Sequence, residues 1–534
     1  MQFDLYIRKI MDYIDVNSVY NLTDFTYANA LSLHISLSAV KGLYEIMKTN
    51  LGINGTLKML ISNSGDSKIT KNGFTLLQEM QIQNPIASLI ARTISAQNYR
   101  IGDGTTSIIV ILGETFKHIE KYIEKGVHPQ ILYQGMNLGK RELDRWLSTQ
   151  KFPLKVDKNT LFSIAKSVLS TKLKSTLSKK LADILSEAIL TVYREGEEID
   201  IQMIEIISIE NQIEFESRFV KGIVLDHGSR HSGMPNILYD SFILLCNISL
   251  EYETTEFESE ISFNCCDNQQ KFLLKEREYV DQKVKKIIQI KRSVCKDKKK
   301  GFLVVNQKGI DTLSLDLLAK EGILAVRRAK RQNLERISLM CNAVPVNSID
   351  DIKPEILGYA GLVYEQIIGD EKFTFIENVT NPFSGTILIK GKNIFLRQQI
   401  KDAIKSGLMS LKIFSKDKCA LHGGGQIEIQ ANKHLTLYSE CIKGKKKFGV
   451  IALAKGMLSI PKILSENSGD DPYKYYSYIS KNIAQSYSVS HFSDLNQYNI
   501  LDCWTVKKQI YESVVSLAST VLLIDEILLG RGLQ

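Results

Sequence analysis

Gly102-Asp103-Gly104-Thr105-Thr106-Ser107 precedes an apolar-periodic run, Ile108 to Ile119, whose spacing predicts a helix. The two glycines let the backbone turn tightly and approach a ligand closely. The three hydroxyl residues fall in the first turn, where unpaired backbone N–H groups and the positive end of the helix dipole attract an anion. Asp103 would repel a bare phosphate, and a divalent cation between the two resolves this conflict. The hexapeptide therefore fits either an Mg–nucleotide phosphate site or an ordinary N-capped helix start.

Size and composition narrow the class of protein. The chain has 534 residues, more than one hydrophobic core usually serves, so we expect two to four domains. The net charge of +9 requires a nucleic-acid role to be weighed. No run of eighteen apolar residues occurs, and Met1 to Tyr13 lacks a signal-peptide cleavage site, so we expect neither a membrane span nor a leader. The eight cysteines are sparse and form no C-x-x-C pair, which favours a reducing, cytoplasmic location over a disulfide scaffold or zinc site.

The N-terminal part reads as helices around a short hairpin. Helical spacing covers about 25–50 and again 78–96. Between them, Leu51–Gly55 suits a phosphate loop or, more simply, a helix C-cap. Lys58 to Ile61 is expected to be a short buried strand, and Asn72-Gly73 is a hairpin-turn signal at the end of the next strand.

The rest of the chain encloses a separate α/β segment. Strands and helices alternate over about 237–363, and the polar stretch 251–270 reads as an exposed insertion. Beyond it come a strand at 386–391, a long helix at 394–415 and a glycine triplet at Gly423–Gly425. Glycine-rich, nucleotide-like loops thus occur near both ends, which favours one domain inserted into another.

Together these loops resemble those of group II chaperonins, specifically subunits of the eukaryotic cytosolic chaperonin, CCT or TRiC. The resemblance is carried by Leu51–Gly55, Thr70–Gly73, Gly102–Ser107, Asp402, Gly423–Gly425 and Asp502. Longer runs look like the zeta subunit, among them Glu79-Met80-Gln81-Ile82-Gln83 and Val506-Lys507-Lys508-Gln509. The resemblance extends over about 26–530. The combination of these loops in this order makes the resemblance specific to the family.

The resemblance implies a multidomain α/β fold with chaperonin architecture. A mainly helical equatorial domain, 1–142 and 411–534, would bind ATP. An intermediate hinge domain would comprise 143–215 and 368–410. An inserted α/β apical domain, 216–367, would meet client proteins and carry a helical lid protrusion near 251–275.

The family also implies partners and cofactors. Eight different subunits form each ring and two rings stack, so the partners would be other chaperonin subunits and unfolded clients such as actin and tubulin. ATP and Mg²⁺ would drive lid closure, and neither membrane nor nucleic acid is expected.

Family roles transfer to the matching residues. Asp103 would hold Mg²⁺, and Asp402 would orient the attacking water. Thr171 and Lys172 would sense the γ-phosphate. The nucleotide would be wrapped by Gly52, Gly104, Thr105, Thr106, Ser107, Gly424, Gly425 and Asp502.

Three departures from the family pattern affect residues expected to bind or hydrolyse ATP. Asn72 stands where the family usually has an aspartate that positions water and metal, and asparagine loses the charge and any base function. The first loop has Ile53-Asn54 in place of the usual Pro-Lys pair, and 497–502 lacks the usual glycine. We therefore expect an ATPase that hydrolyses ATP slowly or not at all. The alternatives are a structural ring subunit that binds nucleotide but hydrolyses it poorly, a structural ring subunit whose nucleotide site is vestigial, or normal turnover with Asp402 sufficing.

Other patterns favour simpler interpretations. Basic runs such as 327–331 and 443–447 can touch nucleic acid, but no aromatic residues interleave them, so solvated faces are favoured. His227 and His231 are four apart, yet Gly228-Ser229 between them indicates a loop rather than a metal-binding helix. No G-x-x-x-x-G-K-[ST] occurs, which excludes a P-loop NTPase.

Overall fold

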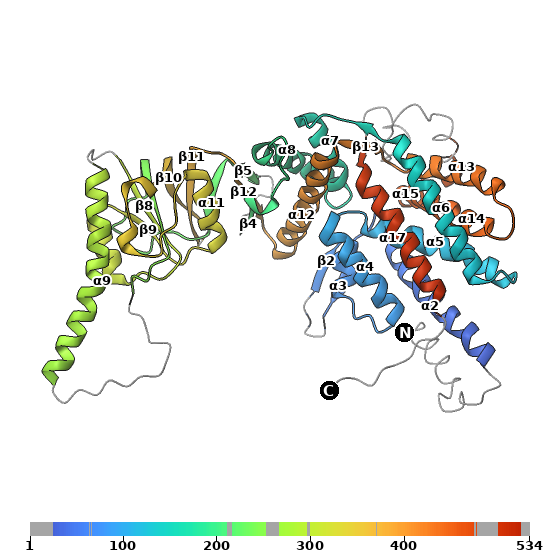
Figure 1. Ribbon diagram of the computed structural model, residues 1–534, viewed down its shortest axis with the longest axis horizontal. Helices are drawn as coiled ribbons and strands as arrows, with labels where there is room; N and C mark the ends of the chain where they lie inside the picture. Colours follow the sequence, from blue (N-terminus) through green and yellow to red (C-terminus); the bar gives the residue numbers. More distant parts are fainter. Residues whose placement is uncertain are drawn as a thin grey trace. The chain divides into compact units, whose positions relative to one another are not determined.

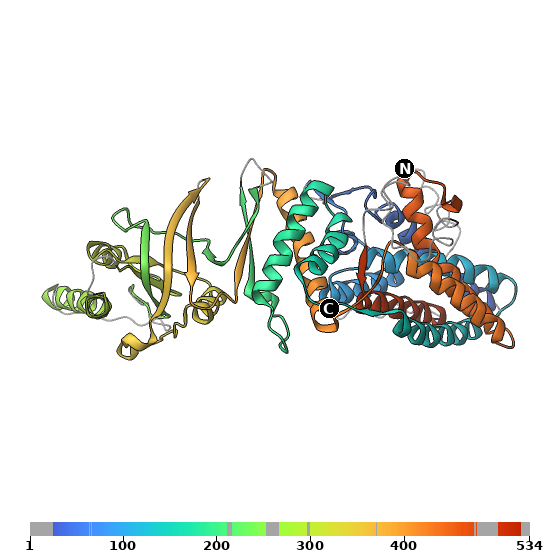
Figure 2. The same ribbon diagram turned by 90° about the horizontal axis from the view of Figure 1, so that it is seen from above.

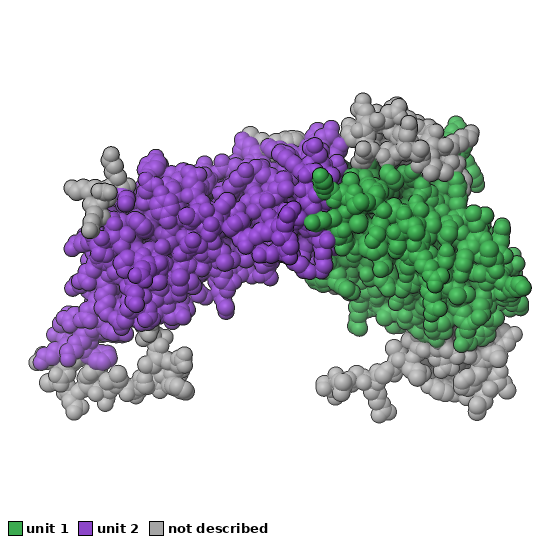
Figure 3. Space-filling model, turned by 45° about the horizontal axis from the view of Figure 1, so that its top comes forward, with its two compact units in different colours: residues 1–155, 170–172, 417–534 green, residues 156–169, 173–416 purple. Residues whose placement is uncertain are grey.

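The structure is a computed structural model that describes residues 25–62, 65, 67–210, 216–251, 266–295, 300–369, 371–474, 477 and 500–524, with the side chains of 25–33, 266–269 and 273 excepted. The chain divides into two compact units, coloured separately in Figure 3. Unit 1 comprises 1–155, 170–172 and 417–534, and unit 2 comprises 156–169 and 173–416. Unit 1 is thus assembled from both ends of the sequence.

Unit 1 is a helical bundle around α5 (Thr105–Glu124), as Figures 1 and 2 show. Helix α5 contacts α2 (Phe25–Lys48), α14 (Lys447–Met457) and α17 (Trp504–Leu523). It can be central because its side chains from Ile108 to Leu112 are all buried, so every face of that stretch meets another helix. The described part of the unit also contains α3 (Gly73–Glu79), α4 (Pro85–Ile101), α6 (Pro129–Gln150), α13 (Gln426–Cys441) and α15 (Ser459–Ser468).

Two small sheets complete unit 1. Strands β1 (Lys58–Ile61) and β2 (Ser67–Thr70) form an antiparallel hairpin. Strand β13 (Cys419–His422) pairs with β3 (Phe152–Pro153) on one side and β14 (Leu501–Cys503) on the other, in the order β14-β13-β3. This second sheet ties three distant segments of the sequence together, with Leu421 opposite Asp502.

Unit 2 contains a six-stranded sheet in the order β6-β11-β10-β7-β8-β9. Strands β7, β8 and β9 run parallel, and each of the other pairs is antiparallel. The strands are β6 (Gly222–Leu225), β7 (Ile237–Cys246), β8 (Phe302–Asn306), β9 (Leu324–Val326), β10 (Gly358–Ile368) and β11 (Glu371–Val379). Strand β8 is buried along its whole length, as a parallel strand covered on both faces should be.

Helices connect the parallel strands of this sheet. Helix α9 (Cys266–Val294) lies between β7 and β8 in the sequence, and α10 (Thr312–Lys320) lies between β8 and β9. Their apolar side chains, with those of α11 (Arg331–Cys341), join one hydrophobic cluster with the strands. A three-stranded sheet in the same unit has the order β4-β12-β5. It is formed by β4 (Ile204–Glu210), β12 (Gly385–Gly391) and β5 (Arg218–Val220), and the unit's other helices are α7 (Lys158–Ser170), α8 (Ser175–Val192) and α12 (Ile394–Asp417).

The predicted fold class, multidomain α/β, is confirmed. The helix predicted over 78–96 is wrong in its bounds, because 80–84 is not helical and Pro85 starts α4 under an Asn84 cap. Asn72-Gly73 is not a hairpin turn, since Asn72 caps α3 instead. Strand β1 exists but is not buried: Met59 is 59% and Ile61 71% exposed, because a two-stranded hairpin has no second layer to cover it.

The predicted exposed insertion at 251–270 falls mostly outside the described residues, since 252–265 are not among them. Its last residues, from Cys266 onward, are helical in α9. The lid role predicted near 251–275 stays a prediction.

One described segment, Lys447–Ser468, is long and apolar enough by composition to cross a membrane. Two thirds of it is buried inside the protein, where α14 packs against α5, α6 and α13. Helices in the core of a globular protein commonly have this length and composition, so the segment is weak evidence for a membrane span.

Candidate nucleotide-binding site

The first element of the site is the N-terminus of α5. Helix α4 ends at Ile101, and Gly102 and Gly104 both adopt left-handed backbone conformations, with φ of 78° and 80°. Gly104 is the N-cap of α5, and no side chain accepts a hydrogen bond from the first backbone N–H groups of that helix. The first turn of a 20-residue helix is therefore open to an anion, as the sequence predicted for Thr105, Thr106 and Ser107.

Gly104 is required at its position by both conformation and space. A Cβ atom built there would lie 2.4 Å from Cδ1 of Ile510 on α17. The close approach ties the loop to the C-terminal helix of the unit. Two sequence-distant parts of unit 1 therefore fix the shape of this loop together.

The turn Thr70–Gly73 lies directly against this loop. A Cβ on Gly73 would be 2.7 Å from Oγ1 of Thr106 and 3.3 Å from Oγ1 of Thr105. The Asn72 side chain accepts a hydrogen bond from the Phe74 N–H at 3.4 Å, which caps α3. Asn72, directly before Gly73, is thus a neutral helix cap in this turn. Its predicted part in the chemistry stays a prediction.

The loop Leu51–Gly55 is held from two directions. Gly52 has φ of 86°, and a Cβ there would lie 2.5 Å from Cδ2 of Leu464 on α15. Asn467 of the same helix donates to the carbonyl oxygens of Lys48 and Leu51, at 3.0 and 2.8 Å. From the other side, Lys71 Nζ donates to the Ile53 carbonyl oxygen at 2.9 Å.

A second glycine-capped helix begins after β13. Gly424 and Gly425 have φ of 67° and 84°, and Gly425 caps the 16-residue helix α13 without a side-chain hydrogen bond. A Cβ on Gly423 would lie 2.9 Å from Oδ2 of Asp502, so the Asp502 carboxylate borders the triplet. The β13–β14 pair therefore brings the glycine triplet and Asp502 together.

Two of the three predicted carboxylates, Asp103 and Asp502, lie near Cys503 of β14. Burial raises the pKa of the Cys503 thiol, and the nearby Asp502, Asp103 and Asp417 carboxylates raise it further. Lys172 Nζ lies 3.8 Å from Oδ1 of Asp103, with the two side chains 11% and 31% exposed. Asp103, Lys172 and Asp502, which are far apart in the sequence, therefore lie in one region of unit 1.

A buried ionic network supports the Asp502 side of the site. Lys507 Nζ lies 3.1 Å from Asp502 and 2.5 Å from Glu428 of α13, and the Tyr511 hydroxyl donates to Glu428 at 3.1 Å. Burial alone would lower the pKa of Lys507, but the carboxylates of Glu428 and Asp502 outweigh it and raise the pKa well above its usual range. The network locks α13, β14 and α17 into one arrangement.

Asp402 belongs to unit 2, where it lies half-buried on α12 and accepts a hydrogen bond from Gln398 Nε2 at 3.0 Å. Its role as the residue that orients water stays a prediction. Thr171 lies beside Lys172 in the short segment of unit 1 that interrupts unit 2.

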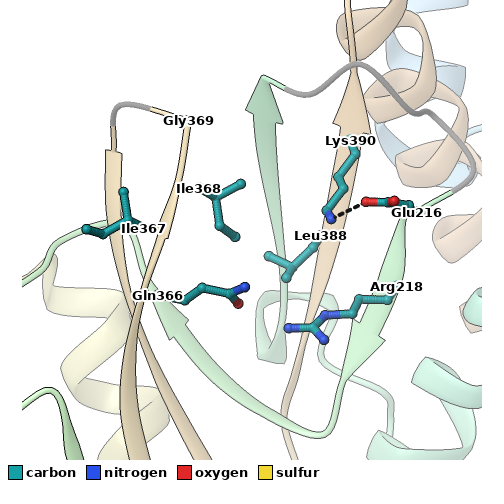
Figure 4. Close-up of a pocket in the computed structure, with 8 residues that line it drawn as sticks. All are labelled: Glu216, Arg218, Gln366, Ile367, Ile368, Gly369, Leu388 and Lys390. Atoms are coloured by element: carbon teal, nitrogen blue, oxygen red, sulfur yellow. Dashed lines mark hydrogen bonds and ion pairs between the residues drawn. The ribbon is translucent and has the colours of Figure 1, made fainter.

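Unit 2 also contains an open pocket of about 500 Å³, shown in Figure 4. It lies beside the end of the β10–β11 hairpin and the β12–β5 pair. Glu216 neutralises its Lys390 at 2.8 Å, and the Arg218 guanidinium lies over the Phe375 ring. None of the predicted site residues lines this pocket.

The residues around Asp103 fit an Mg–phosphate ligand. Within the described part of the chain, no three His, Cys, Asp or Glu side chains gather into a metal cluster. A metal here would therefore take Asp103 plus oxygens of the ligand itself, which is the arrangement Mg²⁺ prefers with nucleotide phosphates. The chemistry available is anion binding by backbone N–H groups and lysine, with a carboxylate for the metal.

Sequence reasoning missed three residues of this region. Lys71 was seen only as part of a turn, and its burial cannot be recognised from the sequence. Lys507 was noticed only within a run that supports the resemblance, and Glu428 was not noticed. An i, i+4 pairing of Lys507 with Tyr511 on a helix was the one available signal for the network.

Comparisons with known proteins identify the family and two relatives of this chain. The model of the TCP-1/cpn60 chaperonin family matches residues 43–531. The chain is 42% identical over 505 residues to T-complex protein 1 subunit zeta-2 of Homo sapiens, covering 93% of this chain and 95% of the relative. It is 40% identical over 505 residues, with the same coverage, to T-complex protein 1 subunit zeta-2 of Mus musculus.

Proposed function

Because the chain belongs to the TCP-1/cpn60 chaperonin family and is similar to its zeta-type subunits, we propose that it is an ATP-binding subunit of a cytosolic chaperonin ring. The ring partners are other chaperonin subunits, as the relatives' names as subunits suggest, and the clients are unfolded proteins such as actin and tubulin. Unit 1 corresponds to the equatorial domain, and unit 2 comprises the intermediate and apical domains. The lid-bearing protrusion belongs near 251–275.

One observation carries the proposal: two glycine-capped helix N-termini, at α5 and α13, occur with Asp103, Lys172 and Asp502 in the same region of unit 1. Gly104 and Gly425 have no side chain that could cap their helices, so an anion can approach the backbone at both helix starts. The unit draws these groups from both ends of the chain. An ordinary helix cap, the simpler interpretation of the hexapeptide alone, explains neither the second helix nor the charged groups around it.

The residues have distinct tasks in this proposal. Asp103 holds Mg²⁺, which when bound neutralises phosphate charge and lets a carboxylate lie beside it. Thr105, Thr106 and Ser107 bind phosphate oxygens through the first turn of α5, and Lys172 offers a cation. Gly424, Gly425 and Asp502 border the nucleoside, and Lys507 orients Asp502.

Hydrolysis depends on groups that activate water. Asp402 orients the attacking water from unit 2, and Asn72 offers only a neutral side chain where a carboxylate would serve better. We therefore infer slow hydrolysis with retained binding. The alternative hypothesis, a structural subunit whose site is vestigial, predicts instead that the chain binds no nucleotide.

The test is Mg-dependent ATP binding by the purified full-length chain, measured by calorimetry for wild type and Asp103→Asn. The expected result is one ATP per chain, weakened about tenfold or more in the variant, which corresponds to about 1.4 kcal/mol. Asp183→Asn is the control, since Asp183 is an exposed carboxylate of unit 2 that pairs with Lys158. If wild type does not bind ATP, or if wild type and Asp103→Asn bind ATP equally well, the proposal is contradicted.

A further inference from the structure

Lys71 is a buried lysine without a counter-charge. Its exposed fraction is 8%, and within the described residues no carboxylate lies at ion-pair distance from its Nζ atom. Its hydrogen-bond partner is the neutral carbonyl oxygen of Ile53, 2.9 Å away. By contrast Lys68, three residues earlier on the same hairpin, is more exposed and pairs with Glu79 at 2.8 Å.

Burying the Lys71 ammonium without a counter-ion costs free energy unless an anion compensates the charge. Removing an ammonium from water without a carboxylate partner disfavours the charged form. Burial accordingly lowers the pKa of Lys71 to about 8. A lysine in such surroundings gains more from a nearby anion than a solvated lysine does, because the anion restores the missing counter-charge.

The position of Lys71 indicates which anion. The lysine joins Leu51–Gly55 to Thr70–Gly73, and Gly73 in turn contacts Thr105 and Thr106 at the open end of α5. The neighbouring Asn72 is neutral, so this turn carries a net positive charge. The other lysines described around these loops already face carboxylates: Lys172 faces Asp103 at 3.8 Å, and Lys507 faces Asp502 at 3.1 Å.

We propose that Lys71 is a phosphate-binding residue whose ammonium, held at the first loop by Ile53, supplies a positive charge to the polyphosphate of the bound nucleotide. The inference rests on the proposed nucleotide-binding function and deepens it. It also gives the first loop, which lacks a lysine of its own, a cation from the adjacent turn. The added positive charge strengthens binding of the nucleotide's phosphates. Tight binding of the nucleotide agrees with the slow hydrolysis proposed above.

The test compares ATP with adenosine, which has no phosphate, on the full-length chain. Affinities are measured by calorimetry for wild type, Lys71→Met and the control Lys68→Met. The expected result is that Lys71→Met lowers the ratio of ATP to adenosine affinity by at least about tenfold, whereas Lys68→Met leaves it unchanged. Adenosine binding by Lys71→Met shows that the variant site is folded.

Thermal denaturation supplies a second readout that a purely structural lysine would not give. Without nucleotide, Lys71→Met should melt at a higher temperature than wild type, because an uncompensated buried charge is removed. With saturating ATP, its gain in melting temperature should be smaller than that of wild type.

Three results would overturn the inference. An unchanged ATP-to-adenosine ratio in Lys71→Met refutes it while leaving the proposed function intact. A variant that melts lower than wild type yet gains as much from ATP assigns Lys71 a structural role instead. A wild-type chain that binds neither ligand defeats the proposed function, and this inference with it.

Discussion

Asn72 caps a helix and also supplies a neutral side chain near the proposed phosphate site. The substitution Asn72→Asp changes the charge without removing the cap. The Asn72 side chain caps α3 through the Phe74 N–H, and the next residue, Gly73, lies against the Thr105 and Thr106 hydroxyls of α5. Aspartate caps helices as well as asparagine does, so Asn72→Asp keeps the cap and adds only a charge. We expect single-turnover ATP hydrolysis to rise at least about tenfold, since a carboxylate can position or deprotonate water.

Asn84 provides the matched control for this prediction. It caps α4 in the same unit by accepting from the Ile86 and Ala87 N–H groups at 2.9 and 3.2 Å. Asn84→Asp makes the same chemical change away from the loops and should leave hydrolysis unchanged. Equal rates in wild type and Asn72→Asp would show that Asn72 does not limit the chemistry.

Gly104 and Gly126 separate backbone strain from crowding. Both have left-handed backbone conformations, with φ of 80° and 77°, but a Cβ on Gly126 meets nothing within 4 Å. Gly126→Ala should therefore lose only about 1 kcal/mol in free energy of unfolding. Gly104→Ala adds the clash with Ile510 and should lose about 2–4 kcal/mol. Urea denaturation measures both, and similar losses would mean that α17 yields to the new methyl group.

At the residue scale, the sequence predicts the site's glycines better than its charges. Gly102 and Gly104 follow from the hexapeptide because positive φ and close approach leave few alternatives. The Lys507–Glu428 pair joins residues 79 apart in the sequence, so no local pattern reveals it. The burial of Lys71 likewise depends on how three loops pack.

Among elements, α13 and α17 depend most on one another. Lys507 of α17 and Glu428 of α13 are both buried, with Glu428 only 1% exposed. Lys507→Met leaves that carboxylate without its cation and should cost about 3–5 kcal/mol in free energy of unfolding. The double variant Lys507→Met, Glu428→Gln should recover much of the loss, measured by urea denaturation. If the single and double variants are equally destabilised, the pair does not couple the helices.

The same pair predicts a pH dependence. The pKa of Lys507 in the folded state lies above that of an unfolded lysine, about 10.4, because its carboxylate neighbours outweigh burial. Its stabilising contribution is therefore complete below that value and is lost as pH rises through the folded pKa. Urea denaturation across the alkaline range should show a steeper loss of stability for wild type than for the double variant. Parallel curves would contradict this.

Elements with strong periodicity were predictable, and short ones were not. The helix after the hexapeptide follows from apolar spacing, and the strands and helices expected over about 237–363 alternate in unit 2. Strand β1 was expected to be buried because most of its residues are apolar, yet burial depends on a covering layer that the spacing of apolar residues does not report. Asn72-Gly73 became a helix start because the Asn72 side chain found the Phe74 N–H.

For the whole molecule, the order of the loops predicted that both ends of the chain build one unit, and unit 1 contains segments from both ends. The division of unit 2 into intermediate and apical domains stays a prediction. The proposed function further predicts that the native protein sediments as a large ring containing other chaperonin subunits. Sedimentation as a monomer from its native source would contradict that assembly.

The central claim is that loops from both chain ends enclose one nucleotide. Photoaffinity labelling with an azido-ATP analogue, followed by peptide mapping, tests it most directly on the full-length protein with Mg²⁺. The account predicts labelled peptides from both 51–107 and 419–511, competed away by excess ATP. Label confined to one of these segments, or located within 216–367, would contradict it.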